Sequence, residues 1–245
     1  MTTTQSSGQS DDSISANAQY FLQHLQEYEK SVAELDTYRT IHNFISAKVA
    51  GVGQLLDVGN GGVFCYDASG VGTITAIDLF LNDIPADLVK AHFPPNARPQ
   101  QGSALALPVA DGTFDMVLMV MLLHHLSGHD WRSSWDNARK AMAEGWRVLK
   151  PGGRFLIVES CVPEWFFSLE KPAFRILSSL TRSIFSHPVT FQFPVRMIED
   201  EFKQKAADVR VHAIPKGKHI LQFGFKVLSI LTPVQLFGIE VQKGN

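Results

Sequence analysis

The sequence predicts an α/β fold in which a doubly wound, mostly parallel sheet of seven strands is covered by helices. The first indication is Leu55–Val63, where a short apolar strand leads into a glycine-rich turn. The second is the alternation of short apolar runs with helical patterns, which is typical of parallel sheets with right-handed crossovers. The third is Phe114–Val120, a near-continuous apolar run of the kind expected for a strand buried on both faces.

Length and composition favour one globular domain with appended segments. The chain has 245 residues, of which 45% are hydrophobic and 19% are charged, and its net charge is -2. This composition suits a sizeable core. Lys and Arg are scattered along the chain, so we expect no nucleic-acid partner. Cys65 and Cys161 cannot build a disulfide framework and the polar N-terminus lacks a signal-peptide core, so we expect a cytoplasmic protein.

We expect a tail and a helical cap before the first strand. Residues 1–14 are rich in Ser, Thr and Gln, which predicts a disordered tail. Residues 15–50 carry apolar side chains at steps of three and four, which predicts N-terminal cap helices. Gly51 and Gly53 end that pattern. Residues 51–245 are then the main domain.

The remaining elements follow from apolar runs and turn residues. The expected strands are 54–58, 73–77, 98–102, 114–120, 154–159, 209–214 and 234–241. The expected helices are 83–92, 131–148 and 195–206, and the last two strands are expected to form a hairpin. Gly62–Asp67 is a poor helix sequence, so the helix that normally follows the first turn is expected to be short or replaced by a loop.

Two further stretches rich in apolar residues follow the fifth expected strand. Ile220–Ile239 is interrupted by Lys226 and Pro233, so it predicts strand, turn and strand rather than a stable membrane insertion. The aromatic-rich segment 160–207 is predicted to be a helical lid inserted after strand five. Candidate pocket residues in the lid and the cap helices, for which a buried helix face is the stronger interpretation, are Trp165, Phe166, Tyr20, Tyr28, Tyr38 and His42.

The glycine-rich turn indicates a nucleotide-type site. Glycines allow the backbone to approach a ligand closely, and Asp78, at the end of the second apolar run, can accept from two ribose hydroxyls. An acid, Asp57, precedes Gly59 and Gly61, and it would repel a pyrophosphate but accept from an ammonium group. The pattern therefore favours a nucleoside that bears an amino acid, and it disfavours an NAD-dependent oxidoreductase.

Three further segments follow the turn in order. They are Gly102–Pro108, Asp111–Leu126, with an "FD…LHHL" pattern, and Arg147–Glu159, with an "LKPGG" turn. Together with the first turn they resemble the class I S-adenosylmethionine-dependent methyltransferases that act on small molecules. The resemblance spans Leu55–Glu159, and it implies a Rossmann-like fold whose last strand is antiparallel.

The resemblance also implies which residues hold S-adenosylmethionine. Asp57 would accept from the methionine ammonium and Asp78 from the ribose hydroxyls. Ser103 stands where relatives usually have an acid near the adenine amino group, so its contact would be weaker. The implied cofactor-binding residues are Asp57, Gly59, Asn60, Gly61, Asp78, Leu79, Ser103, Ala104, Leu105, Met119 and Val120.

His124 and His125 are the candidates for a catalytic base. Adjacent residues face different ways, so one is expected to point into the site, although a packed or capping role is the commoner one for such a histidine. No metal-ligand spacing is present. The predicted function is methyl transfer to a small apolar or aromatic acceptor, and the alternative is a non-catalytic module that binds S-adenosylmethionine or has a degenerate site. The oligomeric state stays open.

Overall fold

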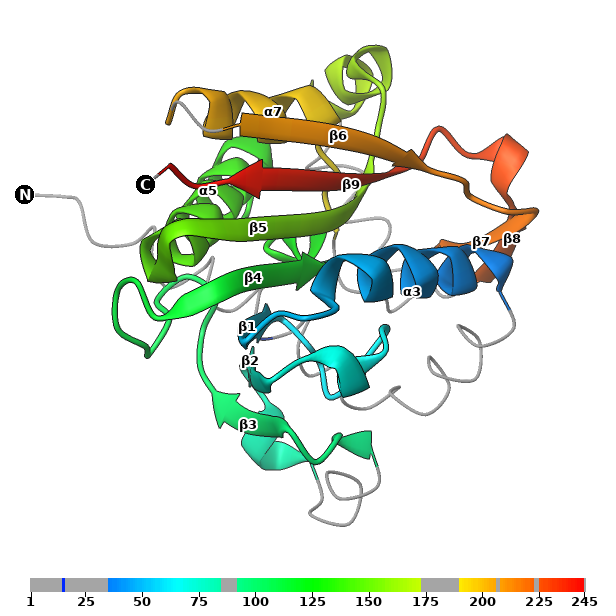
Figure 1. Ribbon diagram of the computed structural model, residues 1–245. Helices are drawn as coiled ribbons and strands as arrows, with labels where there is room; N and C mark the ends of the chain where they lie inside the picture. The colour runs from blue at the N-terminus through cyan, green and yellow to red at the C-terminus, as the bar shows by residue number, and fades with distance from the viewer. Residues whose placement is uncertain are drawn as a thin grey trace, which may run out of the picture.

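The fold is a seven-stranded sheet with helices on both faces (Figure 1). The computed structural model describes residues 35–84, 92–172, 190–205, 208–222 and 225–244, together with Ser15. The strands of the sheet are β1 (Gln54–Val58), β2 (Thr73–Asp78), β3 (Ala97–Gln101), β4 (Phe114–Val120), β5 (Leu149–Cys161), β6 (Asp208–Ile214) and β9 (Gln235–Gln242). The helices with complete bounds are α3 (Asp36–Val49), α5 (Trp131–Val148) and α7 (Val195–Lys203). Shorter elements are η1 (Ala68–Gly70), η2 (Leu81–Asp83), η3 (Leu123–His125), η4 (Ser229–Leu231) and the separate pair β7 (His219–Gln222) and β8 (Phe225–Leu228).

The strand order is β3-β2-β1-β4-β5-β9-β6. The first five of these strands in space are parallel, whereas β9 is antiparallel to both β5 and β6. The predicted mostly parallel, doubly wound sheet is therefore confirmed. The chain winds outward in one direction from β1 to β3 and in the other from β4 onward, so a crevice opens at the carboxyl ends of β1 and β4.

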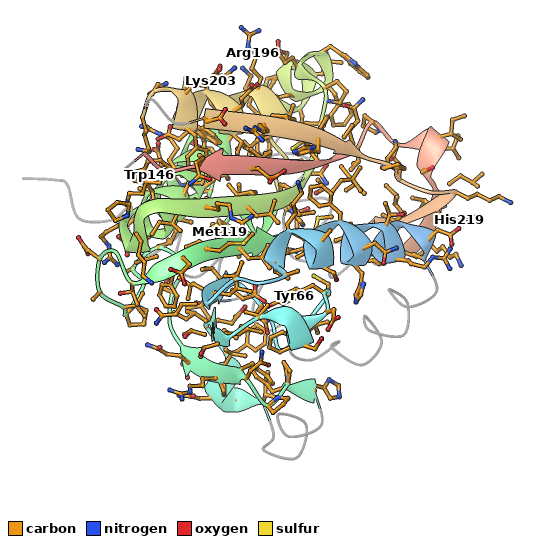
Figure 2. All side chains as sticks on the ribbon, in the orientation of Figure 1. Tyr66, Met119, Trp146, Arg196, Lys203 and His219 are labelled. Atoms are coloured by element: carbon orange, nitrogen blue, oxygen red, sulfur yellow. The ribbon has the colours of Figure 1, made fainter. Side chains whose placement is uncertain are left out.

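Two apolar clusters, one on each face, hold the sheet. Helix α3 buries Ile41, Ile45 and Val49 against one face. Helices α5 and α7 cover the other, where Trp146 and Phe202 lie 5.9 Å apart between ring centroids (Figure 2). Because both faces are covered, β4 is buried along nearly its whole length, as the apolar run predicts.

Most expected elements are found within a residue or two of their predicted ends. The loop expected after the first turn is confirmed, since the only regular element described between β1 and β2 is the short η1. Strand β5 starts earlier than expected, because residues 150–153 form an irregularity within the strand rather than a turn before it. Most of the helix expected over 83–92 lies outside the described residues.

The expected C-terminal hairpin is wrong in its connection. Strands β6 and β9 are antiparallel neighbours, with Ile214 opposite Leu236. However, the chain between them forms the small β7–β8 sheet and η4 before it returns. The apolar stretch that begins at Ile220 is thus used in a second hairpin outside the main sheet.

The cap and the lid are only partly described. Helix α3 accounts for the last part of the helical pattern expected over 15–50, and the rest of it, like residues 1–14, lies outside the described residues apart from Ser15. Of the segment 160–207, the structure gives a helical stretch over 164–172 and helix α7. Among the described residues, no helix is long and apolar enough to cross a membrane.

Candidate active site

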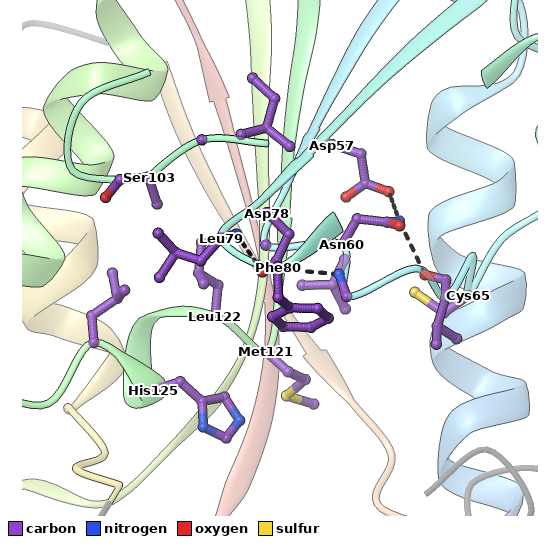
Figure 3. A pocket seen from close by; sticks show the side chains of 18 of the residues that line it. Asp57, Asn60, Cys65, Asp78, Leu79, Phe80, Ser103, Met121, Leu122 and His125 are labelled. Atoms are coloured by element: carbon purple, nitrogen blue, oxygen red, sulfur yellow. Dashed lines mark hydrogen bonds between the residues drawn. The ribbon is translucent and has the colours of Figure 1, made fainter. Parts of the chain in front are cut away.

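A pocket lies at the carboxyl ends of β1, β2 and β4, at the crevice that the topology predicts (Figure 3). Its empty space is about 1170 Å³, part of which is open to solvent. Its lining consists of Tyr38, Ile41, Asp57, Gly59, Asn60, Gly61, Val63, Cys65, Ile77, Asp78, Leu79, Phe80, Gly102, Ser103, Ala104, Val120, Met121, Leu122, His125 and Leu126. Most of these groups are apolar, so the few polar ones define where a ligand's polar groups can bind.

Asp57 is the most deeply buried charged residue of the pocket, with 3% of its surface exposed. It stands near the end of β1, and its Oδ2 accepts from the Asn60 amide at 2.7 Å and from the Tyr66 hydroxyl at 2.9 Å. These two donors hold the carboxylate in place. Among the described residues, no hydrogen bond to the second oxygen, Oδ1, is found, and Asp57 lines the pocket.

Asp78 ends β2, beside the end of β1. Its Oδ2 accepts from the backbone N–H of Gly61 at 3.1 Å, and its Oδ1 accepts from that of Leu79 at 2.6 Å. The glycine turn after β1 is thereby tied to the end of β2. Each oxygen can accept further bonds, so the carboxylate is suited to two neighbouring hydroxyls.

Burial makes both carboxylates weaker acids than usual. It is the main reason why the pKa of Asp57 is raised to about 7, since the hydrogen bonds from Tyr66 and Asn60 lower the pKa and the charge of Asp78 adds a smaller increase. Burial also raises the pKa of Asp78 to about 6, against its backbone hydrogen bonds. Two partly uncompensated acids in one pocket form a site that binds a cation or several hydrogen-bond donors.

The turn between β1 and η1 depends on glycine. Gly59 has a φ of +74°, and a Cβ at that position would lie 2.5 Å from Leu122 Cδ1. Its N–H donates to the Ile77 carbonyl at 2.8 Å, so the turn stays close to β2. The left-handed backbone and the close approach to Leu122 both exclude a side chain there.

The loop after β3 supplies the third side of the pocket. Ser103 and Ala104 line it, but Leu105 does not, and the Leu105 N–H donates to Ser103 Oγ at 3.2 Å. Met119 also lies outside the lining, because successive side chains of β4 point to opposite faces and Met119 is fully buried in the core. The predicted cofactor residues other than Leu105 and Met119 all line the pocket.

The two candidate bases have different surroundings. His125 lines the pocket, whereas His124 is turned toward the buried Glu159, with 2.6 Å between His124 Nδ1 and Glu159 Oε1. Glu159 also accepts from the Leu123 N–H at 2.7 Å, which fixes η3. The rings of His124 and His125 lie 4.1 Å apart between centroids. The contact between His124 and Glu159 therefore also positions His125, the histidine that lines the pocket.

The other candidate pocket residues divide between α3 and the lid. Tyr38 of α3 lines the pocket, and so does Ile41. His42 is exposed on α3 and lies outside the lining, and Tyr20 and Tyr28 lie outside the described residues.

Trp165 and Phe166 do not line the pocket. Trp165 is 63% exposed, and Phe166 packs against the cluster around α5. The neighbouring Phe167 packs edge-on against Trp131 with 6.0 Å between ring centroids. As far as it is described, the aromatic segment therefore covers the helical face of the sheet rather than the pocket mouth.

Several pocket residues had no predictive pattern. Cys65 and Phe80 line the pocket, and the Tyr66 hydroxyl donates a hydrogen bond to Asp57 without lining the pocket itself. Burial raises the pKa of the Cys65 thiol to about 12, so this cysteine is held as a neutral thiol. The one sequence signal that could have identified Tyr66 as a partner of Asp57 is its position as a polar residue close after the glycines.

Comparison with known sequences points to one family. The profile described as "Methyltransferase domain" matches residues 56–157. YcgJ of Bacillus subtilis, an uncharacterized methyltransferase, is 42% identical over 69 residues, which are 28% of this chain and 24% of YcgJ. The C-methyltransferase UbiE of ubiquinone and menaquinone biosynthesis, from Legionella pneumophila, is 29% identical over 143 residues, or 55% of this chain and 53% of UbiE. The first curated relatives are matched over less than half of their own length.

Comparison with solved structures gives the same fold. The YcgJ structure has a TM-score of 0.54 and 18% identity, and the match covers 83% of this chain and 97% of YcgJ. The [4+2]-cyclase SpnF has a TM-score of 0.53 and 14% identity, with 83% and 80% covered. The fold therefore occurs with more than one chemistry, and the site residues must carry any argument about function.

Proposed function

We propose that this chain, which belongs to the class I S-adenosylmethionine-dependent methyltransferase family, transfers a methyl group from that cofactor to a small apolar or aromatic acceptor. The observation that carries the proposal is the pair Asp57 and Asp78. These two carboxylates, Asp57 buried and Asp78 half-buried, lie at the ends of adjacent strands, flank one glycine turn and border one pocket. They match a ligand that has both an ammonium group and vicinal hydroxyls.

The pocket residues fit the cofactor group by group. Asp57 would accept from the methionine ammonium, Asp78 from the ribose hydroxyls, and Ser103 from the adenine amino group. Gly59 leaves room for close approach of the ligand to the backbone. When bound, S-adenosylmethionine supplies a methyl group on a sulfonium, which is already a good leaving group. The protein's task is then mainly to align the acceptor and exclude water.

The acceptor side of the pocket favours an apolar molecule. Its walls include Ile41, Met121 and Leu122, with His125 among them. UbiE is named a C-methyltransferase of quinone biosynthesis, and a ring carbon beside a phenolic hydroxyl is an acceptor of this class. His125 would take the phenolic proton, which makes the ring carbon a better nucleophile. His124, which contacts Glu159, would hold His125 in position from the side away from the pocket.

The test has a binding step and a transfer step. Titration calorimetry with S-adenosylmethionine measures the first. Incubation with tritium-labelled methyl donor and demethylmenaquinol, followed by mass spectrometry, measures the second. Transfer in the native protein that falls in His125→Ala more than in His42→Ala, the exposed histidine of α3, supports the assignment. Absence of cofactor binding would refute the proposal.

A second candidate is a module that binds the cofactor without transferring its methyl group. The similarity to SpnF favours this candidate, because SpnF has the same fold and its name describes a cyclisation and not a methyl transfer. Tight binding with no transfer to any acceptor in an aromatic panel would support this candidate. As compartment we propose the cytoplasm, on the ground that Cys65 and Cys161 are both free thiols.

A further inference from the structure

The segment between β6 and β9, residues 215–234, projects from one edge of the sheet. Ile214 ends β6 opposite Leu236 in β9, and Gln235 of β9 lies opposite Cys161 at the carboxyl end of β5. Both ends of the segment are therefore at the carboxyl edge of the parallel strands, which is the edge that carries the pocket. Figure 1 shows β7, β8 and the turn that follows them at this end of the molecule.

The segment is seated against the helix that lines the pocket. Thr37 Oγ1 at the start of α3 donates to the carbonyls of Lys216 and His219, the latter at 3.0 Å. His219 is labelled beside this end of α3 in Figure 2. The next residue of α3, Tyr38, lines the pocket. The position of the segment is thus fixed relative to the pocket mouth.

The tip of the segment exposes large apolar side chains. Ile230 is 85% exposed and Leu231 is 76% exposed, both in η4, and Leu228 just before them is 39% exposed. These three are half of the six large hydrophobic residues that are exposed in the described part of the chain. Because exposed apolar side chains gain free energy on leaving water, the tip is a candidate contact with another surface.

The charged side chains within the segment itself have one sign. Residues 215–239 contain Lys216, Lys218 and Lys226 and no acid. Lys218 and Lys226 are exposed, and Lys216 donates to carbonyls of η4 and the loop after it, at 3.0 Å and 3.4 Å. The nearest acid on α3, Asp36, is paired with Arg39 at 2.7 Å. The charges that the segment itself carries therefore complement a negatively charged partner.

We propose that the edge segment, residues 215–234, docks the protein on an anionic lipid surface, with Ile230 and Leu231 entering the interface and Lys218 and Lys226 facing the headgroups. Two apolar side chains on one short turn offer too little area for a stable protein interface, which needs roughly 800 Å² per partner. A lipid interface combines apolar burial with attraction of lysines and needs no matching shape. The inference does not depend on the proposed methyl transfer.

The experiment is vesicle flotation of the whole protein. We expect binding to vesicles of phosphatidylcholine with phosphatidylglycerol, and much weaker binding to phosphatidylcholine alone. Ile230→Ser with Leu231→Ser should reduce partitioning by at least about tenfold, because the apolar contribution is lost. Lys218→Gln with Lys226→Gln should remove the preference for the anionic lipid and most of its salt dependence.

Matched control variants distinguish binding through this site from non-specific binding of the protein to vesicles. Leu169→Ser removes another exposed apolar side chain, 65% exposed, from elsewhere on the surface, and Lys140→Gln with Lys203→Gln removes the same charge from α5 and α7. Both should bind vesicles as the native protein does. Circular dichroism and thermal melts confirm that each variant is folded, whether or not the protein binds S-adenosylmethionine.

Two outcomes would overturn the proposal. One is equal flotation of the native protein and the Ile230→Ser, Leu231→Ser variant, which includes the case that neither binds. The other is a self-association in sedimentation equilibrium without vesicles that the same variant abolishes, because the tip would then be an interface between two copies of this chain.

Discussion

The two sides of the carboxyl edge differ in what holds their residues. Around β1 and β2 the polar groups bond to one another, with Asp57 tied to Asn60 and Asp78 to the Gly61 backbone. Around β6 and β9 the edge segment has a few anchors at its base and an exposed apolar tip. On the first side, changing one group disturbs a ligand site. On the second side, we expect that changing one exposed residue of the tip leaves the fold intact and alters only the contacts that the tip can make with other molecules.

The largest effect should come from Asp78→Ala. If the carboxylate binds the ribose, the variant loses two charge-assisted hydrogen bonds worth about 1.5–3 kcal/mol each, so S-adenosylmethionine affinity should fall by roughly 100-fold or more. Titration calorimetry measures it, with Asp83→Ala, an exposed acid in η2, as the matched control. Unchanged affinity in a folded variant would remove Asp78 from the site.

Asp57→Asn should separate binding from stability. The amide keeps the shape but not the charge, so cofactor affinity should fall by about tenfold or more. The ligand-free variant should be more stable than the native protein at about pH 8, by up to about 4 kcal/mol, because it no longer buries a charge. Chemical denaturation with and without cofactor measures both effects. A loss of stability in the ligand-free state would contradict the burial argument.

The same burial gives a pH dependence of cofactor affinity. Asp57 accepts from an ammonium group only when ionised, and its pKa is about 7. Affinity should therefore fall as pH drops from about 8 to 6, by roughly tenfold, and Asp57→Asn should flatten the profile. A native profile that is flat across this range would show that the ammonium is bound elsewhere.

The stability of the ligand-free protein should follow the opposite trend. The folded pKa values of Asp57 and Asp78 lie above their ordinary values, so the folded state binds more protons than the unfolded state between about pH 4 and 7. Stability from these two groups is present at low pH and is lost as pH rises through that window. Thermal melts across the window, compared between the native protein and Asp57→Asn, measure the contribution.

Gly59→Ala tests the turn itself. A φ of +74° and a Cβ contact of 2.5 Å with Leu122 should cost about 1–3 kcal/mol of stability and reduce cofactor binding. Gly112→Ala is the matched control, since it has a φ of +59° with open space around its Cβ. The control should cost only about 1 kcal/mol. Equal losses in the two variants would show that the close approach to Leu122 has no role.

The smallest effect should come from Trp165→Ala on the lid. Trp165 is 63% exposed and lies outside the pocket lining, so we expect a stability change within about 0.5 kcal/mol and unaltered cofactor affinity. Thermal melts and calorimetry measure both. A large rise in acceptor KM would instead place this side chain over the pocket.

The pocket side of β1 and β2 could be predicted because its signals are local. An apolar strand, an acid and glycines within a few residues of each other specify a backbone turn whatever the rest of the fold does. Asp78 follows for the same reason, as an acid at the end of the next strand. The roles of these residues toward a ligand stay predictions, whereas their convergence on one pocket is found in the structure.

Other parts of the site depend on contacts between distant residues. His124 and Glu159 are 35 positions apart, and only the register of β4 with β5 brings them together. The exposure of Trp165 follows from which face the aromatic segment covers, and aromatic content alone does not specify a face. The hairpin β7–β8 was hidden because an apolar run has no marker that separates a main-sheet strand from an outlying one.

The pairing of Ile214 with Leu236 gives the edge segment an unusual freedom to vary. A chain that leaves and re-enters a sheet at neighbouring positions can be lengthened, shortened or exchanged with little change in closure entropy. Residues 215–234 can therefore be replaced as a unit while the pocket edge of the sheet stays as it is. If both proposals hold, the residues that dock the protein and the residues that bind the cofactor lie on separate stretches of the chain.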